Sequence, residues 1–126
     1  MQIQLEHRNQ NTILSYDNHQ LIINEETYRN SVIISPQSIL SPWLLHSVNE
    51  LTLSSMACIM QLNPEVIIIG HANLGERLPI ETQQWLSQQR IGIECMLIGA
   101  AARTFNVLLS EGRAIVAGFI LVRLYT

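Results

Sequence analysis

The chain has 126 residues, of which 48% are apolar and 13% are charged, and its formal net charge is −3. This length predicts one domain, residues 1–126, with a single core. Ordinary hydrophobicity with low charge excludes a disordered chain. The seven basic residues are scattered without a run, so the sequence has no electrostatic footprint for nucleic acid and we predict no nucleic-acid partner.

Nothing in the sequence predicts insertion into a membrane. The longest apolar run, residues 114–122, has nine residues between two arginines, whereas a membrane span needs about 20. The first ten residues, MQIQLEHRNQ, lack the apolar core of a signal peptide. We therefore expect a cytoplasmic protein in which Cys58 and Cys95 are buried, reduced thiols inside apolar runs.

The first third of the chain predicts short strands separated by turn-forming residues. Its runs are rich in Ile, Val, Tyr and Thr and cover residues 12–16, 20–24, 31–35 and 39–45. Pro42 lies within the fourth run, which predicts an edge strand or a bend there.

The hydrophobic period changes after this region and predicts helices that alternate with strands. A helix is expected from Leu51 to about Leu62, because Leu53, Met56, Ala57 and Met60 share one helical face. The later strands are predicted at residues 65–70, 93–98 and 114–122. A second helix begins near Pro79, with Thr82, Trp85, Leu86 and Gln89 facing inward. A third covers residues 100–110, with Ala101, Phe105, Leu108 and Leu109 inward and Gly112 as its C-cap.

This alternation predicts an α/β three-layer sandwich. A mixed central sheet has helices on its faces and right-handed crossovers, and the β-rich first third adds a further layer. The predicted core residues are Ile67, Ile69, Ile93, Met96, Phe105, Leu108, Val116 and Phe119.

Motifs for catalysis, metals and cofactors are missing. Gly70 and Gly75 have the spacing of a phosphate-binding loop, but Glu76 and Arg77 stand where that loop needs Lys and Ser or Thr. There is no G-x-S-x-G, no G-x-G-x-x-G and no C-x-x-C, and the histidines lack metal-ligand spacing. We predict no catalytic residue, metal or cofactor, and we expect His7, His19 and His46 at the surface.

One cluster of residues is a candidate anion site. In a parallel sheet, the loops that follow residues 65–70 and 93–98 emerge at the same carboxyl edge, where open α/β sheets bind ligands. Small residues from Gly99 onward leave the first amides of the third helix accessible, and Arg103 adds positive charge. The candidate site residues are Gly70, His71, Asn73, Arg77, Gly99, Ala100, Arg103, Thr104 and Asn106.

A structural interpretation of the same residues stays open. The small residues would let the third helix pack closely on the sheet, and Arg103, Asn106 and Ser110 would form a solvated helix face. Glu94 either pairs with a nearby arginine or lies in an edge strand.

An ordered set of segments resembles a known family. The set comprises VIIIG from Val66, Leu78-Pro79, GIECM from Gly92, GAA from Gly99, RTFN from Arg103 and LLSEGR from Leu108. This part of the chain resembles the small single-domain proteins of unknown function that include mitochondrial complex I assembly factor 3. The resemblance implies a three-layer α/β fold with a mixed sheet, no established enzymatic activity, and a eukaryotic member that acts by binding another assembly factor.

The chain departs from this family pattern around the candidate site. The family usually has Thr where this chain has His71, and it usually has Thr, Cys and Tyr where this chain has Ile98, Ala102 and Phe105. The departures remove reactive or hydrogen-bonding groups.

We therefore expect a non-catalytic interaction or assembly protein with an unknown protein partner. The alternative is a small-molecule enzyme or sensor that binds an anionic ligand through His71, Arg77 and Arg103. The low charge also predicts apolar surface patches and a possible homodimer.

Overall fold

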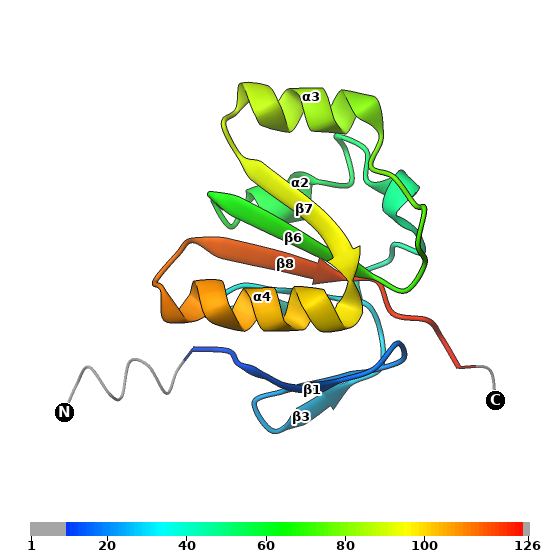
Figure 1. Cartoon of the computed structure of the whole chain (residues 1–126), viewed down its shortest axis with the longest axis vertical. Helices are drawn as coiled ribbons and strands as arrows, with labels where there is room; N and C mark the ends of the chain where they lie inside the picture. Colours follow the sequence, from blue (N-terminus) through cyan, green and yellow to red (C-terminus); the bar gives the residue numbers. More distant parts are fainter. Residues whose placement is uncertain (1–9, 125–126) are drawn as a thin grey trace.

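The computed structural model describes residues 10–124. Its strands are β1 (Ile13–Tyr16), β2 (Leu21–Ile23), β3 (Glu26–Tyr28), β4 (Val32–Ile34), β5 (Ile39–Leu40), β6 (Val66–His71), β7 (Gly92–Leu97) and β8 (Ile115–Phe119). Its helices are the 3-10 helix η1 (Val48–Glu50) and the α-helices α2 (Ala57–Met60), α3 (Ile80–Gln88) and α4 (Ile98–Ser110). Figure 1 shows these elements in sequence colours.

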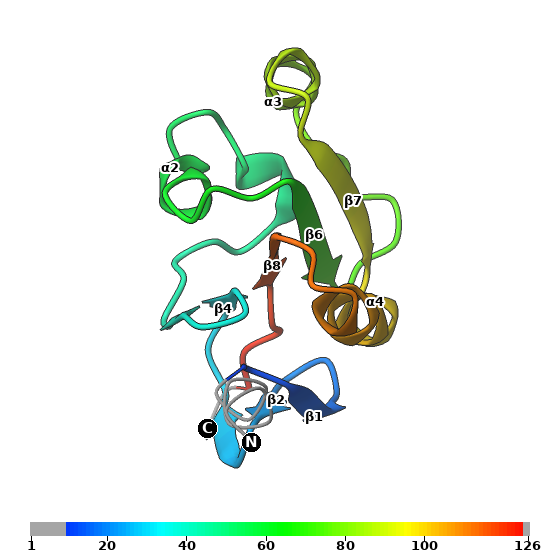
Figure 2. The same cartoon turned by 90° about the vertical axis from the view of Figure 1, so that its left-hand side faces the viewer.

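The centre of the molecule is a mixed five-stranded sheet in the order β5-β4-β8-β6-β7. Strands β8, β6 and β7 run parallel, whereas β4 is antiparallel to both β8 and β5. Helices α2 and α3 lie on one face of this sheet, and α4 lies on the other beside the three-stranded sheet β1-β2-β3 (Figure 2). The predicted layered α/β fold with a mixed central sheet is confirmed.

The core consists of two clusters, one on each face of the sheet. Side chains alternate along a strand, so Ile67 and Ile69 of β6 pack toward α2 and α3, while Ile68 packs toward α4. Burial on both faces explains why β6 is a continuous apolar run. The predicted core residues Ile67, Ile69, Phe105, Val116 and Phe119 are fully buried. The other three, Ile93, Met96 and Leu108, are only partly buried and pack against the two clusters.

Helix α4 packs closely on the sheet because small residues face it. A Cβ added to Gly70 would lie 2.9 Å from the Cβ of Ala101 and 2.7 Å from the ring of Phe119. The helix ends at Ser110 and its C-cap is Glu111, one residue before the predicted Gly112. Gly112 follows the cap with a φ of 74°, in the left-handed region that favours glycine. The amide of Gly112 donates to the carbonyl of Leu109, which closes the last turn.

The helix predicted from Leu51 to Leu62 is wrong over most of its length. Only Ala57–Met60 is α-helical, and Leu53 is 48% exposed. The preceding hydroxyl side chains bond to the backbone instead: Ser55 Oγ donates to the carbonyl of Glu50 at 2.7 Å and accepts from the amide of Thr52 at 2.8 Å. Such local bonds compete with a helix.

The strand predicted over residues 39–45 is also too long. β5 ends at Leu40, at the edge of the sheet. Three residues after the end of β5, the amide of Trp43 donates to the carbonyl of Ser31, and the indole lies over Gly118 of β8. In α3, Thr82 and Leu86 are buried as predicted, but Gln89 is exposed because the helix ends at Gln88.

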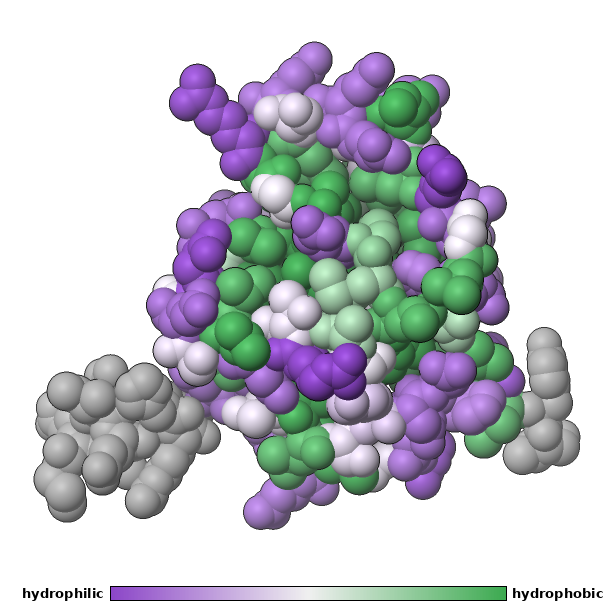
Figure 3. Space-filling view, viewed as in Figure 1, coloured by the Kyte–Doolittle hydropathy of each residue, from purple (hydrophilic) through white to green (hydrophobic). Residues whose placement is uncertain are grey.

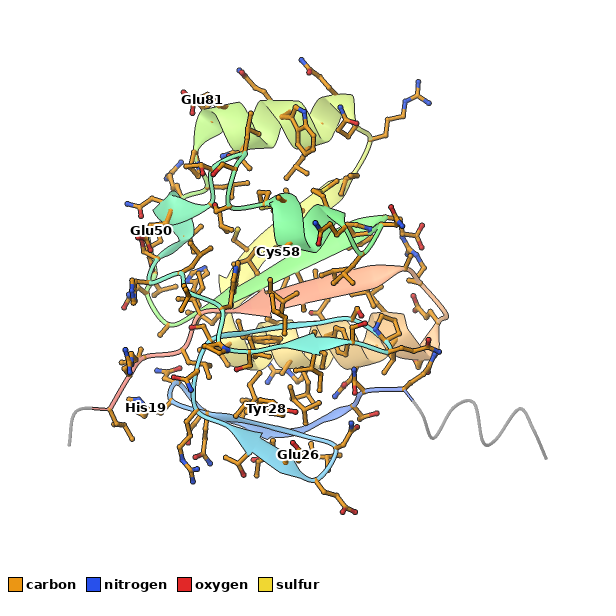
Figure 4. All side chains as sticks on the ribbon, turned by 180° about the vertical axis from the view of Figure 1, so that it is seen from behind. His19, Glu26, Tyr28, Glu50, Cys58 and Glu81 are labelled. Carbon is orange, nitrogen blue, oxygen red and sulfur yellow. The ribbon has the colours of Figure 1, made fainter. Side chains whose placement is uncertain are left out.

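Two further expectations concern membrane spans and cysteines. Among the described residues, no helix combines the length and apolar character required to cross a membrane. Cys58, on α2 (Figure 4), and Cys95, on β7, are both free thiols and are half-buried.

Of the three histidines expected at the surface, His46 is exposed and His19 is half-buried. His7 lies outside the described residues.

Candidate functional site

The predicted site residues lie in separate places around the carboxyl ends of the parallel strands. Gly70 is buried between Phe119 and Ala101, as described above. Its lack of a side chain allows these two residues to pack closely against it. The other predicted residues fall at the first turns of α4, in a pocket at the end of β6, and in a groove between α3 and β7.

The first turn of α4 is covered by a side chain of β1. A Cβ added to Gly99 would lie 2.9 Å from the Tyr16 ring. Arg103, one turn later, donates from Nη1 to the Tyr16 hydroxyl at 2.6 Å, and its Cζ lies 6.0 Å from the ring centroid. Ala100 between them is half-buried. These contacts favour the interpretation in which the small residues serve packing.

The polar residues farther along α4 bond to protein groups. Asn106 Nδ2 donates to the carbonyl of Ile13 at 2.8 Å, and its Oδ1 accepts from the amide of the same residue at 3.1 Å. Asn106 therefore anchors β1 to α4, and its assignment to a solvated helix face is wrong. Thr104 Oγ1 donates to the sulfur of Met96 at 3.5 Å. Ser110, by contrast, is exposed and bonds only within its own helix.

His71 and Asn73 line a pocket of about 330 Å³, which we call the His71 pocket. His71 is the last residue of β6 and is only 6% exposed. Its Nδ1 is buried and has no hydrogen-bond partner among the described residues. The lining residues are His46, His71, Ala72, Asn73, Glu76, Ile120, Leu121, Val122 and Arg123.

Three segments distant in sequence form this pocket. The loop after β6 brings His71 to Glu76, the residues after β8 bring Arg123, and the segment before η1 brings His46. Glu76 Oε1 accepts from the amide of Val48 at 3.0 Å and thereby fixes η1 beside the loop.

A second carboxylate orders the segment that carries His46. Glu50 (labelled in Figure 4) accepts from the backbone amides of His46 at 2.6 Å and Ser47 at 3.0 Å. The His46 amide is the main reason why the pKa of Glu50 lies below its usual value.

The sequence prediction missed His46, Glu76 and Arg123 as lining residues. None of them shares a motif or a spacing with His71, and only the tertiary fold brings them together. The imidazoles do not indicate a metal centre, because no group of three His, Cys, Asp or Glu side chains in residues 10–124 is arranged to hold a metal ion.

Arg77 lines a different cavity, a groove of about 410 Å³ between α3 and β7, which we call the α3–β7 groove. Its lining residues are Glu76, Arg77, Leu78, Gln83, Ser87, Ile91, Ile93 and Cys95. Burial, with a smaller contribution from the Glu94 carboxylate, raises the pKa of Cys95 to about 11. The thiol is therefore protonated at neutral pH and is a poor nucleophile.

Comparison with known proteins identifies relatives that are named as assembly factors. Two of them are NADH dehydrogenase (ubiquinone) 1 alpha subcomplex assembly factor 3 from Xenopus tropicalis and from Danio rerio. The first is 28% identical over 110 residues, which are 86% of this chain and 60% of the relative. The second is 31% identical over 110 residues, which are 86% of this chain and 63% of the relative. The chain thus spans about 60% of the length of these curated relatives.

A solved structure and a family model also match the chain. The NMR structure of a Xanthomonas campestris protein superimposes with a TM-score of 0.83 at 29% identity, and the match covers 92% of this chain and 88% of that chain. A family model described as "Protein of unknown function (DUF498/DUF598)" matches residues 13–120. The resemblance seen in the sequence is confirmed: the chain belongs to the DUF498/DUF598 family.

Proposed function

We propose that this chain is a non-catalytic interaction domain that helps to assemble another protein, and that it binds an extended segment of that protein along the free edge of β7. The names of its relatives support the assembly role, because they are assembly factors that are 28–31% identical to this chain over 110 aligned residues. The observation that carries the proposal is the character of the β7 edge.

β7 is a regular strand with one free side. It is the last strand in the sheet order and, within residues 10–124, pairs with β6 alone, in an unbroken parallel register from Gly92 to Leu97. Natural edge strands are usually protected from pairing by charged side chains, especially Lys, by Pro or by a β-bulge. The β7 sequence, GIECML, has no Lys or Pro, its register shows no bulge, and Glu94 is its single charge. An extended segment of a partner can add to such an edge by main-chain hydrogen bonds.

The surface beside this edge offers apolar contacts among polar ones. Leu97 is 42% exposed at the end of β7, and the α3–β7 groove presents Ile91 and Ile93 to side chains of an added strand, with polar residues around them. Figure 3 shows apolar residues gathered across the middle of the face that carries β7 and α4, below the polar outer side of α3. Large exposed apolar patches of this kind mark interaction sites.

The charge of the edge indicates the chemistry of its partner. Glu94 is exposed and is the single charged residue of β7. A partner strand with a basic residue opposite Glu94 and apolar neighbours would complement it. A second copy of β7 carries no basic residue, so a heterologous strand fits better than self-pairing.

The test begins with a photo-crosslinking residue at Leu97 in the native cell. The cross-linked partner is identified by mass spectrometry and purified, and amide hydrogen exchange is measured in the free and bound chain. We expect the partner to slow exchange of the β7 amides.

Two matched leucine variants then test the edge itself. Leu97→Lys, on the edge, should weaken the affinity by about tenfold or more because it places an uncompensated charge in the interface. Leu74→Lys changes a leucine that is 83% exposed in the loop before α3 and should leave the affinity within about twofold. A partner that protects another surface, or equal effects of the two variants, contradicts the proposal. A cross-link only to a second copy of this chain would replace it with a homodimer.

A further inference from the structure

The His71 pocket has a feature that binding at the β7 edge does not explain. His71 is almost fully buried, yet its Nδ1 has no hydrogen-bond partner within the described residues. Buried polar side-chain atoms are nearly always hydrogen-bonded, so an unpartnered one next to a cavity points to a missing bound group. The pocket also lies beyond the carboxyl ends of the parallel strands β6 and β8, where ligands bind in open α/β sheets.

The lining of the pocket combines a guanidinium group, a carboxylate and two imidazoles. Arg123 is an exposed residue that lines the pocket, and it forms none of the salt bridges found among the described residues. His46 and His71 supply two imidazoles, which can donate or accept. Glu76 uses Oε1 to hold the amide of Val48 and has Oε2 left to accept a further hydrogen bond.

This set of groups selects a class of ligand. Arg123 suits a carboxylate, which guanidinium groups bind with paired, charge-assisted hydrogen bonds. A simple anion would meet repulsion from Glu76, whereas a ligand with a donor next to its carboxylate would satisfy Glu76 as well. Ile120, Leu121 and Val122 offer an apolar wall for a short carbon chain, and about 330 Å³ is enough for a small metabolite.

We propose that the His71 pocket binds a small α-hydroxy or α-amino carboxylic acid. Arg123 binds the carboxylate, Glu76 accepts from the hydroxyl or ammonium group, and the imidazole of His71 hydrogen-bonds to the same ligand. The proposal moves the anion site expected from the sequence away from the Tyr16-covered turn of α4 and into a pocket that shares only His71 and Asn73 with it. It does not depend on the β7 edge, although Glu76 lines both the pocket and the α3–β7 groove.

The test is an NMR titration of the isotope-labelled chain with L-lactate, L-alanine and propionate. These acids have the same number of carbon atoms and differ only in the group beside the carboxylate. We expect saturable shifts at the amides of His71, Ala72 and Arg123 with lactate or alanine, and binding of propionate that is weaker by about tenfold. The stronger of the two ligands distinguishes a hydroxy acid from an amino acid. Absence of saturable shifts with both, or equal binding of propionate, overturns the proposal.

Two arginine variants show whether the shifts report this pocket. Arg123→Gln should weaken binding by about tenfold or more through loss of the paired hydrogen bonds. Arg29→Gln, at an exposed arginine away from the pocket lining, should bind as the original chain does. His71→Phe keeps a flat ring in the buried position and should also lose binding. If that variant fails to fold, Arg123→Gln still decides, because unchanged binding in it refutes the assignment.

Discussion

Replacing Asn106 with Asp tests whether this side chain holds the β1-β2-β3 sheet on the rest of the molecule. The change keeps the shape of the side chain but exchanges the Nδ2 donor for a second oxygen. The bond from Nδ2 to the carbonyl of Ile13, 2.8 Å long, is lost, and a carboxylate oxygen then faces that carbonyl. The bond from the amide of Ile13 to Oδ1 can remain.

The expected loss of stability follows from this geometry. A hydrogen bond of this kind contributes about 0.5–1.5 kcal/mol, and a buried group left unsatisfied costs about 1–3 kcal/mol. Because Asn106 is partly buried, we expect the free energy of unfolding to fall by about 2 kcal/mol at pH 7. For a domain of this size, that corresponds to a drop of about 8 °C in the melting temperature.

Urea unfolding followed by circular dichroism measures this change, and amide exchange shows where it acts. Ser110→Ala is the matched control, because Ser110 lies one turn along the same helix face and bonds only to Val107. It should change the stability by less than about 0.5 kcal/mol. The amides of β1 and β2 should exchange faster in Asn106→Asp. Equal stability of the two variants would refute the role of Asn106 as an anchor.

Three further predictions concern the core and β7. Phe105→Ala should lower the free energy of unfolding by about 3–5 kcal/mol in urea melts, because its fully buried ring leaves a cavity; a small effect would mean that the core collapses around it. Gly118→Ala should cost about 1–3 kcal/mol, because its Cβ would lie 2.5 Å from the Trp43 ring; an unchanged melting temperature would show that the indole moves aside. Cys95, with a pKa raised from 9.0 to about 11, should be alkylated by iodoacetamide at pH 8.5 far more slowly in the folded than in the urea-unfolded chain, as mass spectrometry of its peptide would show. The raised pKa also implies a contribution to stability that is complete below pH 9.0 and is lost as the pH rises toward 11; equal alkylation rates would contradict both statements.

The elements that could be predicted from the sequence are those whose pattern reflects local burial. β6 is recognisable as an apolar run because it is covered on both faces, and α4 because Phe105 and its neighbours repeat with the helical period. The predicted length of α2 is too great because Thr52 and Ser55 form hydrogen bonds with nearby backbone groups. Hydrophobic periodicity carries no information about such bonds. β3 was missed because its residues are polar and largely exposed, so no apolar alternation marks it.

The candidate site was predicted less well because its residues are brought together only by the tertiary fold. The carboxyl edge of the sheet was the right region for a pocket, and His71 and Asn73 line one there. The partner of Asn106, however, is 93 residues away in sequence, and Arg103 is engaged by Tyr16, 87 residues away. No local pattern identifies such partners. His46, Glu76 and Arg123 have no sequence signal in common either.

The position of β8 has a consequence for how the chain folds. It lies between β4 and β6 in the sheet, although the other strands of residues 10–124 all precede it in sequence. The edge of β4 that pairs with β8, for example Val32 with Phe119, therefore stays unpaired until β8 has been synthesised. Until then β6 can pair with β7 alone. During synthesis on the ribosome the sheet remains two separate pieces with exposed apolar edges. Pairing between segments so distant in sequence is expected to make folding slow and to delay it until β8 leaves the ribosome.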